Sequence, residues 1–238
     1  MLTHPINPPK NESELLNRAE NLMGLTLGQM IHQCRLFEKN SNDYSQEAPS
    51  FHKGAVGQWL EKSLGADAGN AAKPDFTQLN IELKTLPIGS NGKSRESTFV
   101  TAISLTQIAQ ETWETSRVYN KLKRVLWVPI EADASIPLLE RRIGQAFLWS
   151  PDAEQMAILA SDWQELSNRI VLGQLETISA KEGTYLQVRP KAADGKSLSW
   201  GINEEGYKVK TLPRGFYLRA FFTAQLLELS KRMTTEVI

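Results

Sequence analysis

Residues 73–86 of this 238-residue chain read KPDFTQLNIELKTL, and this stretch decides how the rest is interpreted. Polar and apolar side chains alternate over residues 80–85, which is typical of a β-strand with one buried face. Side chains two positions apart on a strand point to the same side. We therefore expect Glu82 and Lys84 to share one face, while their apolar neighbours point into the core.

A third charged side chain, Asp75, stands before Glu82 in a Pro-Asp pair that favours a turn. The turn can bring Asp75 back alongside Glu82, so that two carboxylates and the Lys84 ammonium line one edge. Carboxylate oxygens suit Mg²⁺, and a divalent cation can activate water beside a phosphodiester. Glu82-Leu83-Lys84 is the only Glu-X-Lys in the chain. The pattern indicates a metal-dependent nuclease, and an exposed surface ion pair is the alternative that spacing leaves open.

The composition is that of an ordinary globular protein, with 41% hydrophobic and 23% charged residues. The 27 basic residues balance the 27 acidic ones, which argues against a histone-like binder but leaves local patches open. A single cysteine excludes an internal disulfide, and the three histidines lack the spacing of a zinc site. No apolar run approaches the ~18 residues of a membrane span, so we expect a cytoplasmic protein.

Helical and strand patterns are interleaved along the chain. Helices are expected between Asn11 and Gly24 and over residues 26–34, 52–64, 136–144, 151–172 and 222–233. Further strands are expected over residues 97–105, 125–130, 147–149, 185–188 and 216–218. Asn91-Gly92 predicts a hairpin turn, and residues 200–210 are expected to form a polar loop. The order predicts an α/β fold with a mixed sheet flanked by helices.

Other candidate site residues lie outside the central stretch. Glu61, beside the apolar stripe of helix 52–64, could supply a third carboxylate, although its spacing alone favours an exposed helix flank. Three segments mix cations with turn residues and aromatics, namely residues 117–124, 189–196 and 208–219. Arginine and lysine suit guanine edges and phosphates, and Tyr217 could sense a methyl group on adenine. Each segment alone fits an exposed loop, but together they suggest a one-sided basic surface.

The stretches LEKSLGADAG, DFTQLNIELKTLP, KLKRVLWVPIE, QVRPKAA and TLPRGFYL, with others, closely resemble the MutH family of methyl-directed DNA mismatch-repair endonucleases. The resemblance runs from about residue 12 to about residue 229. It implies one restriction endonuclease-like domain, residues 1–238, whose two lobes form a DNA-binding cleft. The approximate N-terminal lobe, 11–115, would carry the catalytic residues, and the C-terminal lobe, 116–238, the DNA-reading loops.

The resemblance also implies an activity. A monomer would nick the unmethylated strand of double-stranded DNA 5′ to the guanine of hemimethylated GATC sites, and would also accept unmethylated GATC. The reaction would need Mg²⁺, with Mn²⁺ able to replace it in vitro and Ca²⁺ binding without supporting cleavage. MutL, recruited with ATP by MutS, would activate it. The alternatives are a GATC-specific type II restriction endonuclease that cuts both strands and a non-catalytic DNA-binding protein of the same fold.

The resemblance assigns roles position by position. Asp75, Glu82 and Lys84 match the catalytic triad, and Glu61 matches an additional active-site glutamate. We expect the Asp75 and Glu82 carboxylates and the Leu83 backbone carbonyl to bind the metal, with Glu61 binding a second metal or acting through water. The matching DNA-binding positions are Lys53, Lys121, the reading loop Arg189, Pro190 and Lys191, and the methyl-sensing Tyr217.

Overall fold

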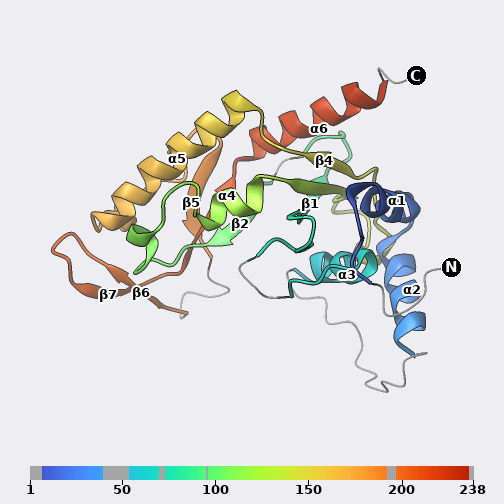
Figure 1. Cartoon of the computed structure of the whole chain (residues 1–238), viewed down its shortest axis with the longest axis horizontal. Helices are drawn as coiled ribbons and strands as arrows, with labels where there is room; N and C mark the ends of the chain where they lie inside the picture. Colours follow the sequence, from blue (N-terminus) through green and yellow to red (C-terminus); the bar gives the residue numbers. More distant parts are fainter. Residues whose placement is uncertain (1–6, 40–53, 70–72, 95, 192–196, 236–238) are drawn as a thin grey trace. The chain divides into compact units, whose positions relative to one another are not determined.

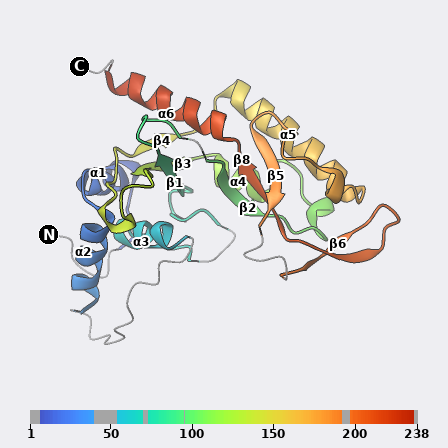
Figure 2. The same ribbon diagram turned by 180° about the vertical axis from the view of Figure 1, so that it is seen from behind.

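The computed structural model describes residues 7–39, 54–69, 73–94, 96–191 and 197–235, and Figures 1 and 2 show its elements from two sides. The chain divides into two compact units that interleave in sequence. Unit 1 comprises Met1–Ser94 and Arg124–Trp149, and unit 2 comprises Arg95–Lys123 and Ser150–Ile238.

Three helices begin unit 1: α1 (Glu12–Leu22), α2 (Leu27–Lys39) and α3 (Ala55–Leu64). α1 begins at the expected cap, where Asn11 Oδ1 accepts the Glu14 N–H at 2.9 Å. α2 runs past its expected end at Cys34, because good helix formers follow and no glycine or proline interrupts them. Their buried side chains form one core with the sheet, including Leu15, Leu22, Met30, Leu60 and Leu64.

The sheet of unit 1 contains β1 (Glu82–Ile88), β3 (Val125–Glu131) and β4 (Phe147–Trp149), in the order β1-β3-β4. β1 and β3 are parallel, whereas β3 and β4 are antiparallel. The central strand β3 is buried almost throughout, as its continuous apolar run requires. The expected mixed sheet is confirmed, although β4 rather than the hairpin turn makes it mixed. That turn forms, with Gly92 at φ +70°, but adds only an isolated bridge between Ile88 and Ser94.

The helix expected over residues 136–144 is wrong. Only a single 3₁₀ turn, η2 (Leu138–Glu140), forms there. The chain beyond it is extended, and its backbone bridges to Thr26 and to Ile130. These bridges provide hydrogen-bond partners for backbone N–H and C=O groups that would be paired within the chain in a helix.

Unit 2 is built on the antiparallel sheet β2-β8-β5, whose strands are β2 (Thr98–Ala102), β5 (Leu186–Pro190) and β8 (Arg214–Leu218). Its helices are α4 (Arg117–Leu122), α5 (Ala153–Val171) and α6 (Ala220–Thr235), with 3₁₀ turns η1 (Ile108–Gln110) and η3 (Leu175–Thr177). α5 starts with a capping box formed by Asp152 and Gln155. Figures 1 and 2 both show α5 beside β5.

A two-stranded sheet in unit 2 replaces the expected polar loop over residues 200–210. β6 (Ser199–Ile202) and β7 (Lys208–Thr211) pair in antiparallel register. The turn is closed by the Tyr207 N–H, which donates to Asn203 Oδ1 at 2.8 Å, and Gly206 takes a left-handed φ of +82°. The described strands therefore form three sheets rather than one. None of the helices among the described residues is long and apolar enough to cross a membrane.

The two units do not follow the expected division into residues 11–115 and 116–238. β3 returns to pair with β1 in unit 1, whereas β2 crosses into unit 2 to pair with β8. Whether the units act as lobes that close on DNA stays a prediction.

Candidate active site and DNA-reading strands

A tight loop brings Asp75 to the start of β1. The Phe76 N–H donates to the Ile81 carbonyl at 2.9 Å, and the Ile81 N–H donates back at 3.3 Å. Between them Asn80 takes a left-handed φ of +54°, a conformation that asparagine adopts more readily than most residues. Asp75 Oδ2 then accepts the backbone N–H of Leu83 at 2.8 Å. The first carboxylate is thereby fixed one residue from Glu82.

Glu82 and Lys84 share one face of β1, as their spacing predicts. The Lys84 Nζ lies 2.6 Å from Glu82 Oε1, and the two side chains are only 12% and 4% exposed. The alternative of an exposed surface pair is therefore wrong. Burial makes this pair energetically significant, because exposed ion pairs are worth little.

The donor set fits a hard divalent cation. Asp75 and Glu82 are 8% and 3% exposed, and buried carboxylates need a hydrogen bond, an ion pair or a metal. Oxygen ligands of this kind suit Mg²⁺. Within the part of the chain that the structure describes, no three acidic, histidine or cysteine side chains gather as a metal cluster.

Glu61 is therefore not brought together with Asp75 and Glu82 in a three-carboxylate cluster. It lies half-buried on α3, a helix that packs near β1 within unit 1. Its role as a fourth active-site residue stays a prediction. Lys53 lies outside the described residues.

Asp67 supports the loop that carries Asp75 and was not found from the sequence. Its carboxylate accepts the Thr77 N–H at 2.8 Å and the Thr77 hydroxyl at 2.5 Å. Its own N–H donates to the Asp75 carbonyl at 3.0 Å. Burial acts to raise the pKa of the Asp67 carboxyl, but the Thr77 hydrogen bonds outweigh it and hold that pKa below its usual value. In the sequence, Asp67 is only one acid within residues 65–72, a stretch of small residues.

The residues of unit 2 that are expected to read DNA meet on neighbouring strands. Arg189 and Pro190 are exposed and belong to β5, which extends two residues beyond its expected end. The register pairs Arg189 with Gly215 and Gln187 with Tyr217 of β8. The Lys191 N–H donates to the Pro213 carbonyl at 2.8 Å, which ties the end of β5 to the start of β8.

Phe99 on β2 joins these residues, although only its alternation within a strand was visible in the sequence. Its ring meets Tyr217 edge-on, with 5.3 Å between centroids, and the Lys191 ammonium lies 3.8 Å above the Phe99 ring. The Arg189 guanidinium lies 5.8 Å from the Tyr217 ring. Burial raises the pKa of the Tyr217 hydroxyl, and the Arg189 charge partly opposes this. The group combines cations with aromatic faces, a combination suited to nucleic acid.

Comparison with known proteins shows which family the chain belongs to. Residues 64–162 match the family model described as DNA mismatch repair enzyme MutH. The DNA mismatch repair protein MutH of Vibrio campbellii is 48% identical over 221 residues, covering 92% of this chain and 94% of that protein. The protein of that name from Escherichia coli O1:K1 is 47% identical over 222 residues, covering 93% of this chain and 94% of that protein. The chain belongs to the MutH family. It is therefore a DNA mismatch-repair endonuclease, as the resemblance implied.

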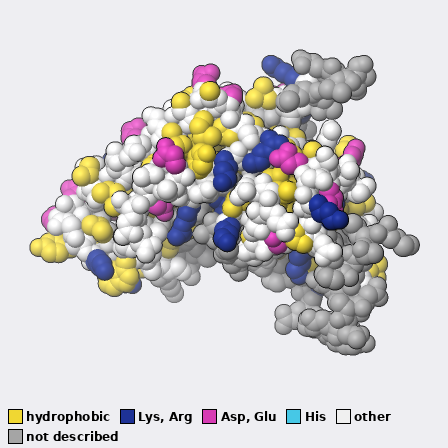
Figure 3. Space-filling model, in the orientation of Figure 1, with side chains coloured by type: hydrophobic (Ala, Val, Ile, Leu, Met, Phe, Trp, Pro, Cys, Tyr) yellow, Lys and Arg dark blue, Asp and Glu magenta, His cyan; other side chains and the backbone are white. Residues whose placement is uncertain are grey.

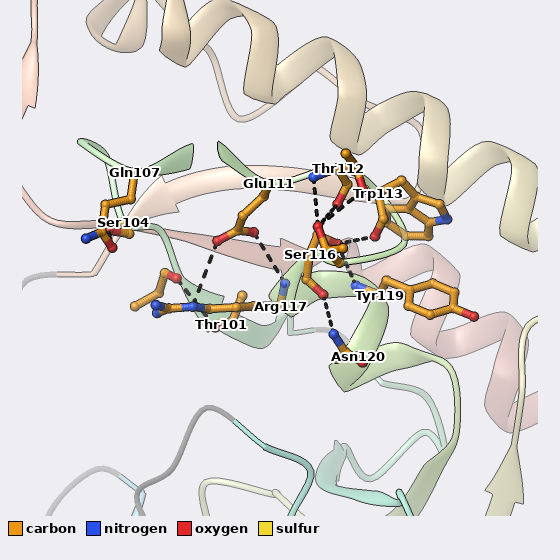
Figure 4. A network of polar contacts seen from close by, with 12 residues as sticks. Thr101, Ser104, Gln107, Glu111, Thr112, Trp113, Ser116, Arg117, Tyr119 and Asn120 are labelled. Atoms are coloured by element: carbon orange, nitrogen blue, oxygen red, sulfur yellow. Dashed lines mark hydrogen bonds and ion pairs between the residues drawn. The ribbon is translucent and has the colours of Figure 1, made fainter. Parts of the chain in front are cut away.

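A polar network in this MutH family member fixes α4, which carries Lys121 (Figure 4). Ser116 is fully buried, and its Oγ accepts the Tyr119 N–H at 3.0 Å while donating to the Trp113 carbonyl at 2.7 Å. The Asn120 side chain donates to the Ser116 carbonyl at 3.1 Å. Lys121 is half-buried in the last turn of this short helix. α4 was not predicted from the sequence, because its six residues are too few for a periodic pattern.

The one-sided basic surface stays a prediction. On the face that Figure 3 shows, lysine and arginine side chains lie together with acidic ones, in keeping with the balanced charge of the chain.

Proposed function

We propose that this MutH family member nicks the unmethylated strand of hemimethylated GATC sites 5′ to the guanine, in a Mg²⁺-dependent reaction. The observation that carries the proposal is the buried constellation at the start of β1, in which Asp75, Glu82 and Lys84 lie together. High identity with DNA mismatch repair proteins over nearly the whole chain supports the same conclusion.

The Asp75 and Glu82 carboxylates and the Leu83 carbonyl would hold the metal ion. When bound, Mg²⁺ would lower the pKa of a water ligand and neutralise charge on the scissile phosphate. The Asp75 hydrogen bond to the Leu83 N–H fixes the side chain that would bind the ion, so the ligands would need little rearrangement. Glu61 would act through water or on a second ion.

Lys84 would orient the attacking water and stabilise the charge that builds on the phosphorus-bound oxygens. Its ammonium is held by Glu82, so it cannot swing freely before the substrate arrives. The water oxygen attacks phosphorus in line, the bond to the 3′ oxygen breaks, and the products are a 5′-phosphate and a 3′-hydroxyl.

The residues that recognise the GATC sequence would lie in unit 2. Arg189, Pro190 and Lys191 would read the GATC base edges, and Tyr217 would sense the adenine methyl group. Lys121 and Lys53 would contact the DNA backbone. The hydrogen bond from the Lys191 N–H to the Pro213 carbonyl supports a fixed position for Arg189, Pro190 and Lys191, which we call the reading edge.

We further propose that the protein is a cytoplasmic monomer that MutL activates, with MutS and ATP acting upstream. A monomer with one active site cuts one strand per encounter, whereas a GATC restriction enzyme would dimerise and cut both strands.

The test is a nicking assay on hemimethylated and unmethylated GATC plasmids, with Mg²⁺, Mn²⁺ or Ca²⁺ and with or without MutL. Nicked circles made with Mg²⁺ or Mn²⁺, faster with MutL and absent with Ca²⁺, are the expected products. Linear plasmid formed without accumulation of nicked circles would indicate a restriction enzyme instead. No cleavage under any condition would leave a DNA-binding role.

A further inference from the structure

One face of the β6–β7 sheet carries aromatic and basic side chains that are not among the proposed site residues. The register sets Trp200 opposite Lys210 and Ile202 opposite Lys208. Directly opposed residues share a face, and so do residues two apart. We call this set, Trp200, Ile202, Lys208 and Lys210, the outer face of the hairpin. Trp200 is 53% exposed, and both lysines are exposed.

The other face of the hairpin is attached to unit 2. Gly201 and Thr211 are buried there, and the Thr211 hydroxyl donates to Glu176 Oε1 at 2.5 Å. A Cβ on Gly201 would lie 2.9 Å from Thr211 Cγ2, so the packing leaves no room for a side chain. The backbone of Asn203 presses so closely on Gly173 that a Cβ there would lie 2.1 Å from its carbonyl carbon. Both ends of the hairpin are therefore fixed, and the outer face is presented as a rigid surface.

The outer face has a positive character. Neither Lys208 nor Lys210 forms an ion pair with a carboxylate among the described residues. The Lys210 ammonium lies 4.0 Å above the Trp200 ring, which holds it out of reach of the turn. The two exposed acids of the hairpin, Glu204 and Glu205, are confined to the turn at its far end. Trp200 and Lys210 lie toward the base of the hairpin, away from these acids, and Lys208 lies in the last pair before the turn.

The base of the hairpin continues into the proposed reading edge. β7 ends at Thr211, two residues before Pro213, whose carbonyl accepts the Lys191 N–H. DNA held at Arg189 and Lys191 would run past this base. A duplex carries one negative charge per ~1.7 Å of its axis, so its flanks supply the acidic surface that the two lysines fit.

We propose that the outer face of the hairpin binds the phosphate backbone of the DNA duplex beyond the GATC sequence. This inference rests on the proposed function, because the reading edge sets where the DNA lies. Lys208 and Lys210 neutralise phosphates, and the Trp200 ring holds the Lys210 side chain extended over the strand. The binding is independent of base sequence and adds affinity without adding specificity.

The test compares the full-length protein with a Lys208→Ala/Lys210→Ala variant and a Trp200→Ala variant. Binding to a GATC duplex of about 30 base pairs is measured over a range of salt concentrations with Ca²⁺, and again with a duplex trimmed to about 10 base pairs. Removing one lysine–phosphate interaction should lower the slope of log affinity against log salt by about 0.9. The slope of the double variant should therefore fall by about 2 on the long duplex and not at all on the short one. Trp200→Ala should lower the slope by about 1, because the Lys210 side chain is no longer supported.

Lys181→Ala is the matched control, because this exposed lysine lies before the opposite end of β5. It should leave the salt slope unchanged on both duplexes. An unchanged slope in the double variant overturns the inference, as does an equal decrease on the two duplexes. Abolished stimulation by MutL with unchanged DNA binding would assign the face to a protein partner and would also overturn it. Failure of the wild-type protein to nick GATC would contradict the proposed function separately, because the slopes are measured without cleavage.

Discussion

Replacing Lys84 with alanine is the sharpest perturbation of the proposed active site. The Lys84 ammonium lies 2.6 Å from Glu82 Oε1, and the side chains are 12% and 4% exposed. Removing one partner of so buried a pair costs about 3 to 5 kcal/mol of folding free energy, against about 1 kcal/mol or less for an exposed pair. Removing a positive charge aimed at the reacting phosphate should lower the nicking rate by about 10²- to 10³-fold.

A divalent cation should restore part of the stability of this variant but not its nicking rate. The Glu82 carboxylate is left buried without the Lys84 charge, and a bound cation would supply positive charge to the same oxygens. Mg²⁺ should therefore raise the thermal midpoint of the variant more than that of the wild type. Unfolding is followed with and without Mg²⁺, and nicking is measured in single turnovers on a hemimethylated GATC duplex. Lys93→Ala, an exposed lysine in the turn after β1, is the control and should change neither measurement.

Two results would refute this reasoning. A Lys84→Ala rate within about threefold of wild type would remove Lys84 from the chemistry. An equal effect of Mg²⁺ on the midpoints of both proteins would separate Glu82 from the metal ligands. Lys84→Met is tested as well, in case Lys84→Ala is too unstable to assay. The unbranched methionine side chain keeps most of the packing of the lysine stem while removing its charge.

Three further changes test other parts of the structure. Tyr217→Ala removes the ring that Phe99 meets edge-on. The ratio of the nicking rate on the unmethylated strand to that on the methylated strand should fall about tenfold or more. An unchanged ratio would contradict methyl sensing by Tyr217. Asp67→Asn should lower the thermal midpoint at neutral pH. The folded-state pKa of Asp67 lies below its ordinary value of 3.8, so the difference in midpoint between wild type and variant should be complete above pH 3.8 and disappear as the pH falls through the lowered pKa. A difference that stays constant with pH would refute this role of the Asp67 carboxylate. Asp162→Ala leaves three backbone N–H groups without their acceptor and should cost about 3 kcal/mol in denaturant unfolding, with the exposed Asp152→Ala costing only about 1 kcal/mol.

The central stretch was predictable because its information is local. Alternation placed Glu82 and Lys84 on one face, and a Pro-Asp pair predicted the turn that returns Asp75 to β1. The burial of the ion pair was not predictable. It depends on the parallel pairing of β1 with β3, which lies more than forty residues further along the chain.

The predictions of secondary structure that were wrong lie where long-range pairing or a turn overrides a local sequence pattern. Residues 136–144 contain good helix formers, but two of them pair in extended form with distant segments. The polar segment 200–210 becomes a hairpin, because the Asn203 side chain and Gly206 supply a closed turn. Propensity is a weak prior that tertiary contacts override in both cases.

The proposed active site in unit 1 and the proposed reading strands in unit 2 are each fixed by a buried carboxylate that accepts backbone N–H groups, and the sequence did not predict these hydrogen bonds. In unit 1, Asp75 accepts the N–H of Leu83 and so fixes the start of β1, the strand that carries Glu82 and Lys84. In unit 2, the buried Asp162 of α5 accepts the N–H groups of residues 184–186 at 2.6 to 2.8 Å and fixes the start of β5, the strand that ends in Arg189. Removing a buried carboxylate that accepts backbone N–H groups costs folding free energy, because the donors lose their partner. Each strand therefore starts at a fixed position in its sheet, and this fixes where its proposed functional side chains lie. The two acids differ in one respect: Asp75 would also bind the metal, whereas the hydrogen bonds of Asp162 within the described part of the chain are to backbone N–H groups. Removal of the Asp75 carboxylate should therefore abolish nicking even where the fold survives, and removal of the Asp162 carboxylate should act on DNA reading only through the placement of β5.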